Sequence, residues 1–131
     1  MIKVFVVEDH AVVRKGIISV LQQQDGLAVL GEAEDGITAL RSLHNGLQPD
    51  VLLTDLNMPG MDGIQLVRRI TDQKINLPCI ILTMHNSAEF LEKAQAAGAR
   101  GYLLKNGDMQ ELIACIKDVH NGLLVVGKEF R

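Results

Sequence analysis

VLLTDLNMPG, residues 51–60, contains a short apolar run that ends on Asp55 and continues straight into a proline–glycine turn. Three further apolar runs lead in the same way to a polar residue. Each run is too short for a helix and shows little polar alternation, which is typical of strands buried on both faces of a parallel sheet. The three runs are Ile2–Val7, Ile80–Leu82 and Tyr102–Leu104, which lead to Asp9, Thr83 and Lys105.

Segments with the apolar spacing of helices separate these runs, and a weaker strand is expected at Leu27–Ala33, where Gly31 interrupts it. Strands and helices that alternate need crossover connections and therefore pair in parallel. We expect an α/β fold, a doubly wound five-stranded parallel sheet with the flavodoxin-like strand order 2-1-3-4-5. Gly98 is expected to cap the fourth helix and Asp108 to open the last. The expected helices lie at about 10–23, 37–46, 61–70, 87–97 and 108–120.

The end of the chain departs from this alternation. Gly122 ends the last expected helix, and Leu123–Val126 is a short apolar run that no helix follows. We therefore expect one domain over residues 1–121 and the beginning of a linker over residues 122–131.

Length and composition limit the function classes. The 131 residues are 47% hydrophobic and 22% charged, which is ordinary for one globular domain, and the net charge of −3 gives no basic surface for nucleic acid. No apolar stretch approaches the roughly 20 residues that span a membrane, and the chain begins with a strand rather than a secretion signal. Cys79 and Cys115 form no CxxC pair, so we expect reduced, buried cysteines and a cytoplasmic location.

The carboxyl ends of parallel strands lie along one edge of a sheet, and ligands bind there. Asp55 is therefore expected at the tip of its strand, exposed and able to attack a phosphoryl group as a nucleophile. Such a transfer needs a cation between two anions, and Glu8 and Asp9 are carboxylates of the kind that hold Mg²⁺. Lys105 and Thr83 offer an ammonium and a hydroxyl to the phosphoryl oxygens.

Taken singly, these residues have plainer interpretations. An aspartate before a proline–glycine turn is common in loops, and a lone lysine is usually a surface residue. The joint placement of four such residues at four strand ends carries the prediction. The paired cations Arg14–Lys15 and Arg68–Arg69 have no interleaved aromatic residues, so we interpret them as solvated helix faces.

Three stretches resemble a known family. They read VFVVEDHAVVRKGI at residues 4–17, DVLLTDLNMPGMDGIQLVRRI at 50–70 and ILTMHNSAEFLEKAQAAGARGYLLKN at 81–106. Over about residues 2–121 the chain is similar to the receiver domains of two-component response regulators. It resembles most the NarL/FixJ group, whose members usually carry a LuxR-type helix-turn-helix DNA-binding domain after the receiver.

The resemblance implies a role for each residue of the expected site. Asp55 matches the aspartate that takes a phosphoryl group from a sensor histidine kinase. Glu8 and Asp9 match the acidic pair that binds Mg²⁺, Asp9 directly and Glu8 through water. Asn57 matches the residue whose backbone carbonyl also binds the metal.

The resemblance also implies how the signal leaves the site. Thr83 and Lys105 match the residues that contact the phosphoryl group, and Tyr102 matches the switch aromatic that follows the threonine. The surface formed by the fourth helix, the fifth strand and the fifth helix would then change, leading to dimerisation or to release of an output domain. Such a protein is not an enzyme, would contact DNA only through a further domain, and has no membrane partner.

The sequence departs from the commonest pattern of this family in two places. Asn106 stands where a proline often follows the lysine, and a cis bond before a non-proline residue costs about 2.5–4 kcal/mol, so we expect none. Met84 stands where a small residue is frequent, and its bulk is expected to narrow access to Asp55. Asn57 and His85, each two residues beyond a strand-end residue, are expected to tune the loss of phosphate.

Three alternative functions stay open at this point. A stand-alone receiver would act by protein contact, without an output domain. An aspartate-nucleophile phosphatase would place its nucleophile after the first strand and a second acid two residues later, where this chain has Asn57. A flavodoxin-type electron carrier would need a hydroxyl- and glycine-rich first loop and aromatic residues, which make up only 3% of this chain.

Overall fold

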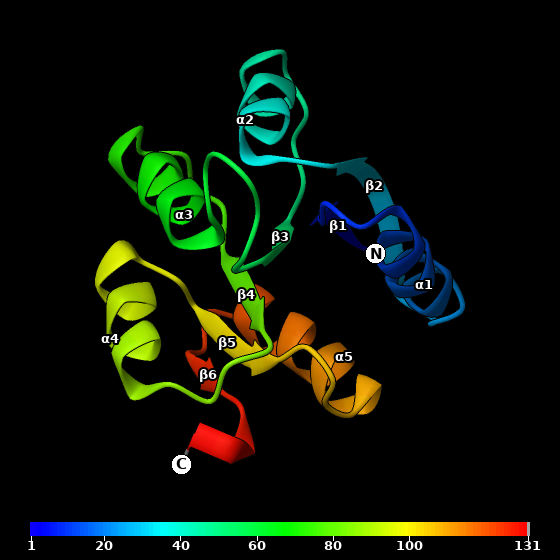
Figure 1. Cartoon of the computed structure of the whole chain (residues 1–131). Helices are drawn as coiled ribbons and strands as arrows, with labels where there is room; N and C mark the ends of the chain where they lie inside the picture. Colours follow the sequence, from blue (N-terminus) through cyan, green and yellow to red (C-terminus); the bar gives the residue numbers. More distant parts are fainter. Residues whose placement is uncertain (131) are drawn as a thin grey trace.

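A single parallel sheet forms the centre of the computed structural model, which describes residues 1–130 (Figure 1). Its strands run in the order β2-β1-β3-β4-β5-β6, so the predicted order of the first five is confirmed. All neighbouring strands pair in parallel. The strands are β1 (Ile2–Val7), β2 (Leu27–Ala33), β3 (Val51–Asp55), β4 (Cys79–Thr83), β5 (Gly101–Leu104) and β6 (Val125–Val126).

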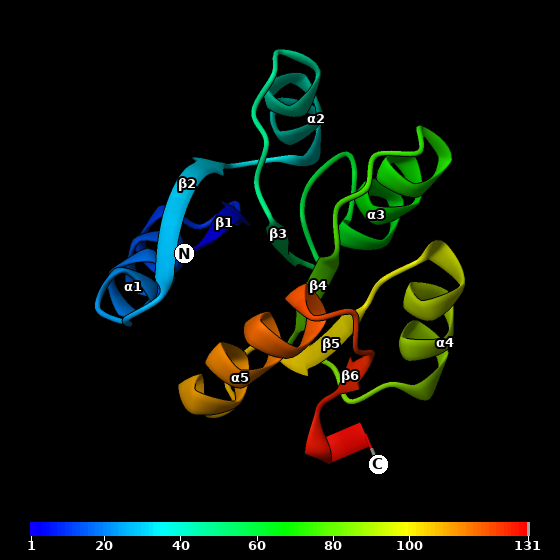
Figure 2. The same cartoon turned by 180° about the vertical axis from the view of Figure 1, so that it is seen from behind.

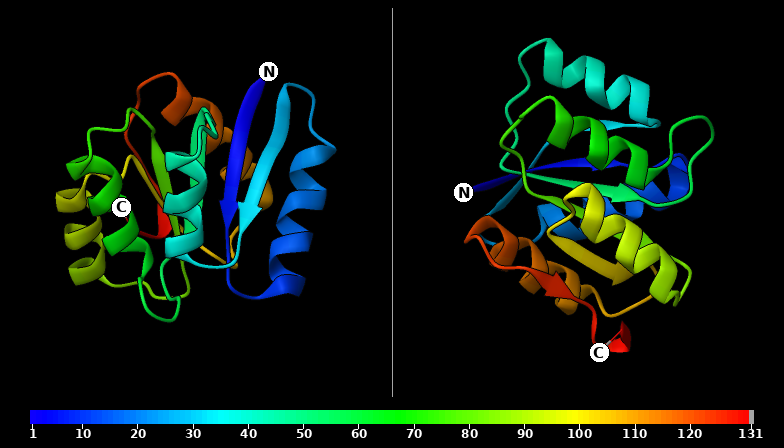
Figure 3. Two further views of the ribbon diagram at one scale, coloured as in Figure 1. Left: turned by 90° about the horizontal axis from the view of Figure 1, so that it is seen from above. Right: turned by 90° about the vertical axis from the view of Figure 1, so that its left-hand side faces the viewer.

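Helices cover both faces of the sheet, as a doubly wound fold requires. α1 and α5 lie on one face, and α2, α3 and α4 lie on the other (Figures 1 and 3). No helix among the described residues is long and apolar enough to cross a membrane. The helices are α1 (Ala11–Gln22), α2 (Gly36–His44), α3 (Gly63–Asp72), α4 (Ala88–Ala97), α5 (Met109–His120) and the short 3-10 helix η1 (Lys128–Phe130).

The two layers of core follow from the alternation of side chains along each strand. On β1, Phe5 and Val7 pack toward α2, α3 and α4, whereas Val4 and Val6 pack toward α1 and α5. All four side chains are at most 1% exposed. Burial of both faces explains why the strands read as unbroken apolar runs instead of alternating ones.

Two helix ends have the caps that the sequence predicts. Gly98 adopts φ 107° at the end of α4, and the Asp108 carboxylate accepts a hydrogen bond from the backbone N–H of Gln110. Asp62 and Gln65 form a reciprocal capping box that opens α3. The first helix begins one residue later than a start directly after Asp9, with His10 at its N-cap.

The residues expected to form only a linker extend the sheet. Val125 and Val126 pair with Gly101 and Tyr102 as the sixth strand, so the expected total of five strands is wrong by one. A two-residue strand has no periodicity of its own, and its pairing depends on the exposed edge of β5. Arg131, the last residue of the expected linker, lies outside the described residues.

Candidate phosphoryl-acceptor site

The register of the sheet brings the predicted strand-end residues together. Asp55 of β3 pairs with Leu82 of β4, and Thr83 of β4 pairs with Leu104 of β5, so each strand ends at nearly the same level. Lys105 follows directly, with its backbone N–H bonded to the Thr83 carbonyl oxygen at 2.6 Å. The edge that the sequence predicts as the site is therefore formed by β1, β3, β4 and β5.

Acidic side chains gather at this edge. Ligand atoms of Glu8, Asp9, His10 and Asp55 all lie within 4.8 Å of one another. Glu8 is 1% exposed and Asp55 is 4% exposed. The expected exposure of Asp55 at the strand tip is therefore wrong: the side chain sits in the floor of the site, enclosed by its neighbours.

Lys105 joins two of these carboxylates. Its Nζ lies 3.0 Å from Asp55 Oδ2 and 2.5 Å from Glu8 Oε1. The side chain itself is only 14% exposed, so water screens these ion pairs weakly. One ammonium thus balances part of the negative charge that the sheet edge concentrates.

This crowding shifts the pKa values of all three groups. Burial and the charge of Glu8 raise the pKa of Asp55 despite the opposing ammonium of Lys105. Burial also acts to raise the pKa of Glu8, but the backbone N–H of His10 and the Lys105 ammonium outweigh it and lower that pKa. Burial acts to lower the pKa of Lys105, but the two carboxylates outweigh this effect and raise that pKa.

The backbone of Asp55 is held as tightly as its side chain. A Cβ atom on Gly63, the first residue of α3, would lie 2.3 Å from the Asp55 carbonyl oxygen. The N–H of Gly63 donates to the Leu56 carbonyl oxygen at 2.8 Å. The loop after β3 therefore closes back onto its own strand, and only a glycine leaves room for this approach.

Thr83 and Tyr102 lie behind the acidic cluster. Thr83 is fully buried, and its Oγ1 accepts the backbone N–H of His85 at 3.0 Å. Tyr102 is 1% exposed, and burial raises its pKa against the opposing effect of the Thr83 side chain. Met84 and His85 are exposed, with the His85 ring 5.9 Å from that of Phe90.

Arg14 takes a part in the site that its sequence context does not suggest. Its Nη1 donates to the Glu8 carbonyl oxygen at 2.7 Å, and its Nε donates to Glu32 Oε1 at 2.8 Å. The side chain is 13% exposed, so its interpretation as part of a solvated helix face is wrong. Arg14 lies in the first turn of α1, six residues after Glu8, and this closeness in sequence is the one signal that points to the contact.

The donor set suits a hard divalent cation. Asp9 Oδ1 is buried and accepts no hydrogen bond from any described residue, and the Glu8 and Asp55 carboxylates lie beside it. Carboxylate oxygens are the protein ligands that Mg²⁺ prefers. The residues present therefore fit the ion that the sequence predicts.

Comparison with known proteins agrees with this geometry. The response regulator receiver domain family matches residues 4–117 of the chain. The chain belongs to this family. This receiver domain is 36% identical over 122 residues to the response regulator GacA of Pseudomonas aeruginosa. The match covers 93% of this chain and 56% of GacA.

Solved structures similar to this chain are also receiver domains or response regulators of the LuxR family. A LuxR-family two-component response regulator from Aurantimonas superimposes with a TM-score of 0.92 at 34% identity, covering 98% of this chain and 91% of that one. The isolated receiver domain of RcsB from Salmonella enterica, solved with the phosphomimetic BeF3⁻, gives 0.88 at 31% identity over 98% of this chain and 95% of that one. The chain spans about half the length of curated relatives such as the response regulator GacA.

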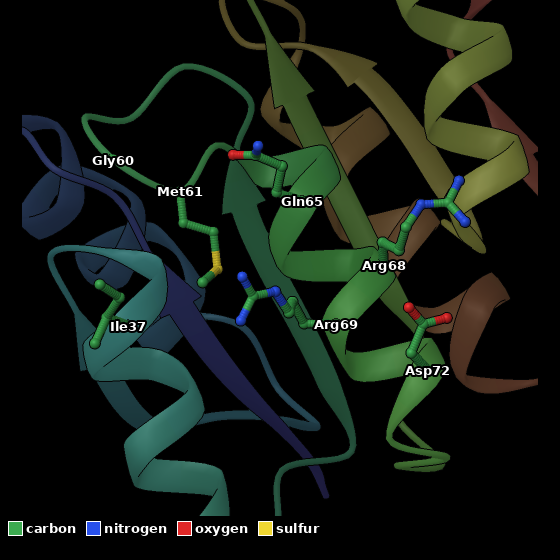
Figure 4. Close-up of a pocket in the computed structure, with 7 residues that line it drawn as sticks. All are labelled: Ile37, Gly60, Met61, Gln65, Arg68, Arg69 and Asp72. Carbon is green, nitrogen blue, oxygen red and sulfur yellow. The ribbon is translucent and has the colours of Figure 1, made fainter.

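One surface cleft of the receiver domain is separate from the acidic cluster. It lies between α2 and α3, where Ile37 and Met61 form an apolar side and Arg69 reaches toward them (Figure 4). Arg68 and Asp72 stand on the far side of α3 from this pair. Both arginines are exposed, in agreement with their interpretation as a solvated helix face.

Proposed function

We propose that this receiver domain accepts a phosphoryl group on Asp55 from a sensor histidine kinase. The observation that carries the proposal is one cluster: the Asp55 carboxylate lies among Glu8 and Asp9, and the Lys105 ammonium is 3.0 Å from it. An acceptor, carboxylates for a cation and a fixed ammonium are the groups that phosphoryl transfer asks of a protein.

In the proposed transfer, an oxygen of the Asp55 carboxylate attacks the phosphorus atom of a phosphohistidine. A bond forms between that oxygen and phosphorus, and the bond from phosphorus to the histidine nitrogen breaks with its electron pair on nitrogen. The attack needs the deprotonated carboxylate, which the Lys105 ammonium stabilises against burial and against Glu8. The product is an acyl phosphate on this chain, so the domain is a substrate of the kinase and not an enzyme.

Mg²⁺ is the proposed cofactor, held by Asp9 and Asp55 directly, by the Asn57 backbone carbonyl, and by Glu8 through water. When bound, it would neutralise charge between the donor phosphate and the acceptor carboxylate. Asp9 Oδ1, buried without a hydrogen bond among the described residues, supports this assignment.

The new phosphoryl group would favour a second arrangement of the domain. Its added charge, about −1.5 to −2 for phosphorylated side chains, draws the Thr83 hydroxyl and the Lys105 ammonium toward it. The ring of Tyr102, which is already buried in this structure, would then move toward the space that Thr83 leaves, and the surface of α4, β5 and α5 would shift. Asn57 and His85, whose side chains are both exposed, are proposed to set how quickly water removes the phosphate.

The output is proposed to lie in the part of the protein that this chain does not include. The chain spans about half of relatives such as the response regulator GacA. A DNA-binding domain after residue 131 would be controlled by homodimerisation or by release from the receiver. A stand-alone receiver that acts by protein contact is the alternative.

Acetyl phosphate and Mg²⁺ test the acceptor function without knowledge of the kinase. Intact mass spectrometry is expected to show one phosphate-sized gain on the wild type, none on Asp55→Asn, and none after EDTA. Asp72→Asn, which removes an exposed carboxylate of α3, is the matched control and should gain the same mass as the wild type. An equal gain on wild type and Asp55→Asn would overturn the assignment.

A further inference from the structure

The last residues of the described chain fold back onto the sheet. The N–H of Val125 donates to the Arg100 carbonyl oxygen at 2.9 Å, and the N–H of Gly127 donates to the Tyr102 carbonyl oxygen at 2.8 Å. β6 therefore occupies the edge of β5, and it lies between α4 and α5 in both views (Figures 1 and 2). We call residues 123–130 the C-terminal strap.

Two side-chain contacts continue this docking beyond β6. The ring of Phe130 meets the ring of Tyr102 edge to face, with centroids 4.9 Å apart and planes inclined at 67°. Phe130 also packs against the core layer on the α2, α3 and α4 face. On the other side of the strap, the Lys128 N–H donates to Glu111 Oε2 at 3.1 Å.

The residue that the strap covers is the one that stands behind the acceptor site. Tyr102 is 1% exposed, and it belongs to β5, the strand that Lys105 directly follows. Phe130 lies against its ring, so an outward turn of Tyr102 would have to displace Phe130 first. A docked strap thus selects the buried position of Tyr102.

We propose that the C-terminal strap is a latch on Tyr102, and that its docking and the phosphorylation of Asp55 favour each other. The second half rests on the proposed function, in which Thr83 moves toward the phosphoryl group and leaves space for Tyr102. Docking of the strap and phosphorylation would both favour the buried Tyr102 ring. Each must therefore raise the equilibrium constant of the other by the same factor. The strap then carries the state of the site directly to whatever follows residue 130.

The latch itself is tested without phosphate, by hydrogen exchange of the wild-type chain and four variants. The amides of Val125 and Gly127 are expected to be protected in the wild type, and to exchange faster in Phe130→Ala and in Tyr102→Leu. Tyr102→Phe keeps the ring, and Leu123→Ala alters a half-exposed side chain of the strap, so both should keep wild-type protection. Unprotected amides in the wild type, or equal exchange in Tyr102→Leu and Tyr102→Phe, would overturn the latch.

The coupling is tested with beryllofluoride and Mg²⁺ as a phosphoryl analogue. Saturation is expected to slow exchange at Val125 and Gly127 further in the wild type, and Phe130→Ala should bind the analogue about threefold more weakly, the scale of one aromatic pair. Equal affinity of Phe130→Ala and Leu123→Ala, or faster exchange in the bound wild type, would contradict the coupling. A wild type that binds no beryllofluoride would count against the proposed function, while the exchange of the Tyr102 variants would still decide the latch.

Discussion

Lys105 is the residue on which the electrostatics of the site depend. Its ammonium contacts Glu8 and Asp55, two carboxylates that are almost fully buried. Folding therefore removes two like charges from water and places them side by side with one cation between them. Such an arrangement costs stability, and the cost is concentrated on Asp55, whose pKa is raised.

Replacement of Asp55 by Asn should stabilise the protein in the absence of Mg²⁺. A carboxyl group whose folded pKa is raised binds more protons folded than unfolded, so stability falls as pH rises above the ordinary aspartate range. At neutral pH we expect Asp55→Asn to raise the free energy of unfolding by about 1 kcal/mol. In acid, where Asp55 is protonated, the difference should vanish. Urea denaturation in EDTA at both pH values measures this, and a less stable Asp55→Asn at neutral pH would refute it.

Replacement of Lys105 by Met should have the opposite effect. It leaves Glu8 and Asp55 buried without their ammonium, and loss of one partner from such a cluster costs about 3 kcal/mol of unfolding free energy. Lys15→Met, which removes an exposed lysine of α1, is the control and should change stability by less than about 0.5 kcal/mol. Equal urea midpoints for the two variants would show that the ion pairs contribute nothing.

At the scale of the elements, the loop between β3 and α3 fixes where the acceptor points. The Asp62 capping box opens α3, and Gly63 then passes against the Asp55 carbonyl oxygen. The backbone at the start of α3 thus packs directly against the carboxyl end of β3, which carries Asp55. A glycine is needed here because of a close approach, and not because of an unusual φ angle.

Gly63→Ala should therefore destabilise the protein by about 2 kcal/mol, since its Cβ would meet a backbone oxygen that cannot move alone. Gly16→Ala, in the exposed part of α1 with no atom within 4 Å of the added Cβ, should instead stabilise it by about 0.5–1 kcal/mol. Thermal unfolding of both variants makes the comparison. If the two substitutions shift the midpoint alike, the close approach has no energetic weight.

At the scale of the whole molecule, the sheet gathers residues that lie far apart in the sequence. Four strand ends supply the site, and this much could be predicted from apolar runs that each lead to a polar residue. The burial of Asp55 could not, because it depends on Lys105 and Glu8 closing over it. The docking of Phe130 on Tyr102 could not be predicted either. It depends on the pairing of the two-residue strand β6 with the edge of β5, and so short a strand has no pattern of its own in the sequence.

Mg²⁺ should stabilise the whole fold through the site. An ion that binds only the folded chain raises the free energy of unfolding by about 2.7 kcal/mol at a hundredfold excess over its dissociation constant. We expect the melting temperature to rise with Mg²⁺ and to return on adding EDTA. Asp9→Asn should lose most of this rise and the exposed Asp72→Asn should keep it. A similar rise in Asp9→Asn would place the ion elsewhere.

The most direct measurement is to locate the phosphoryl group itself. After incubation with acetyl phosphate and Mg²⁺, borohydride reduces an aspartyl phosphate to homoserine, which peptide mass spectrometry assigns to one position. The proposed function predicts homoserine at position 55 and at no other acidic residue. Reduction at Asp9 or at any other aspartate, with residue 55 unchanged, would contradict it.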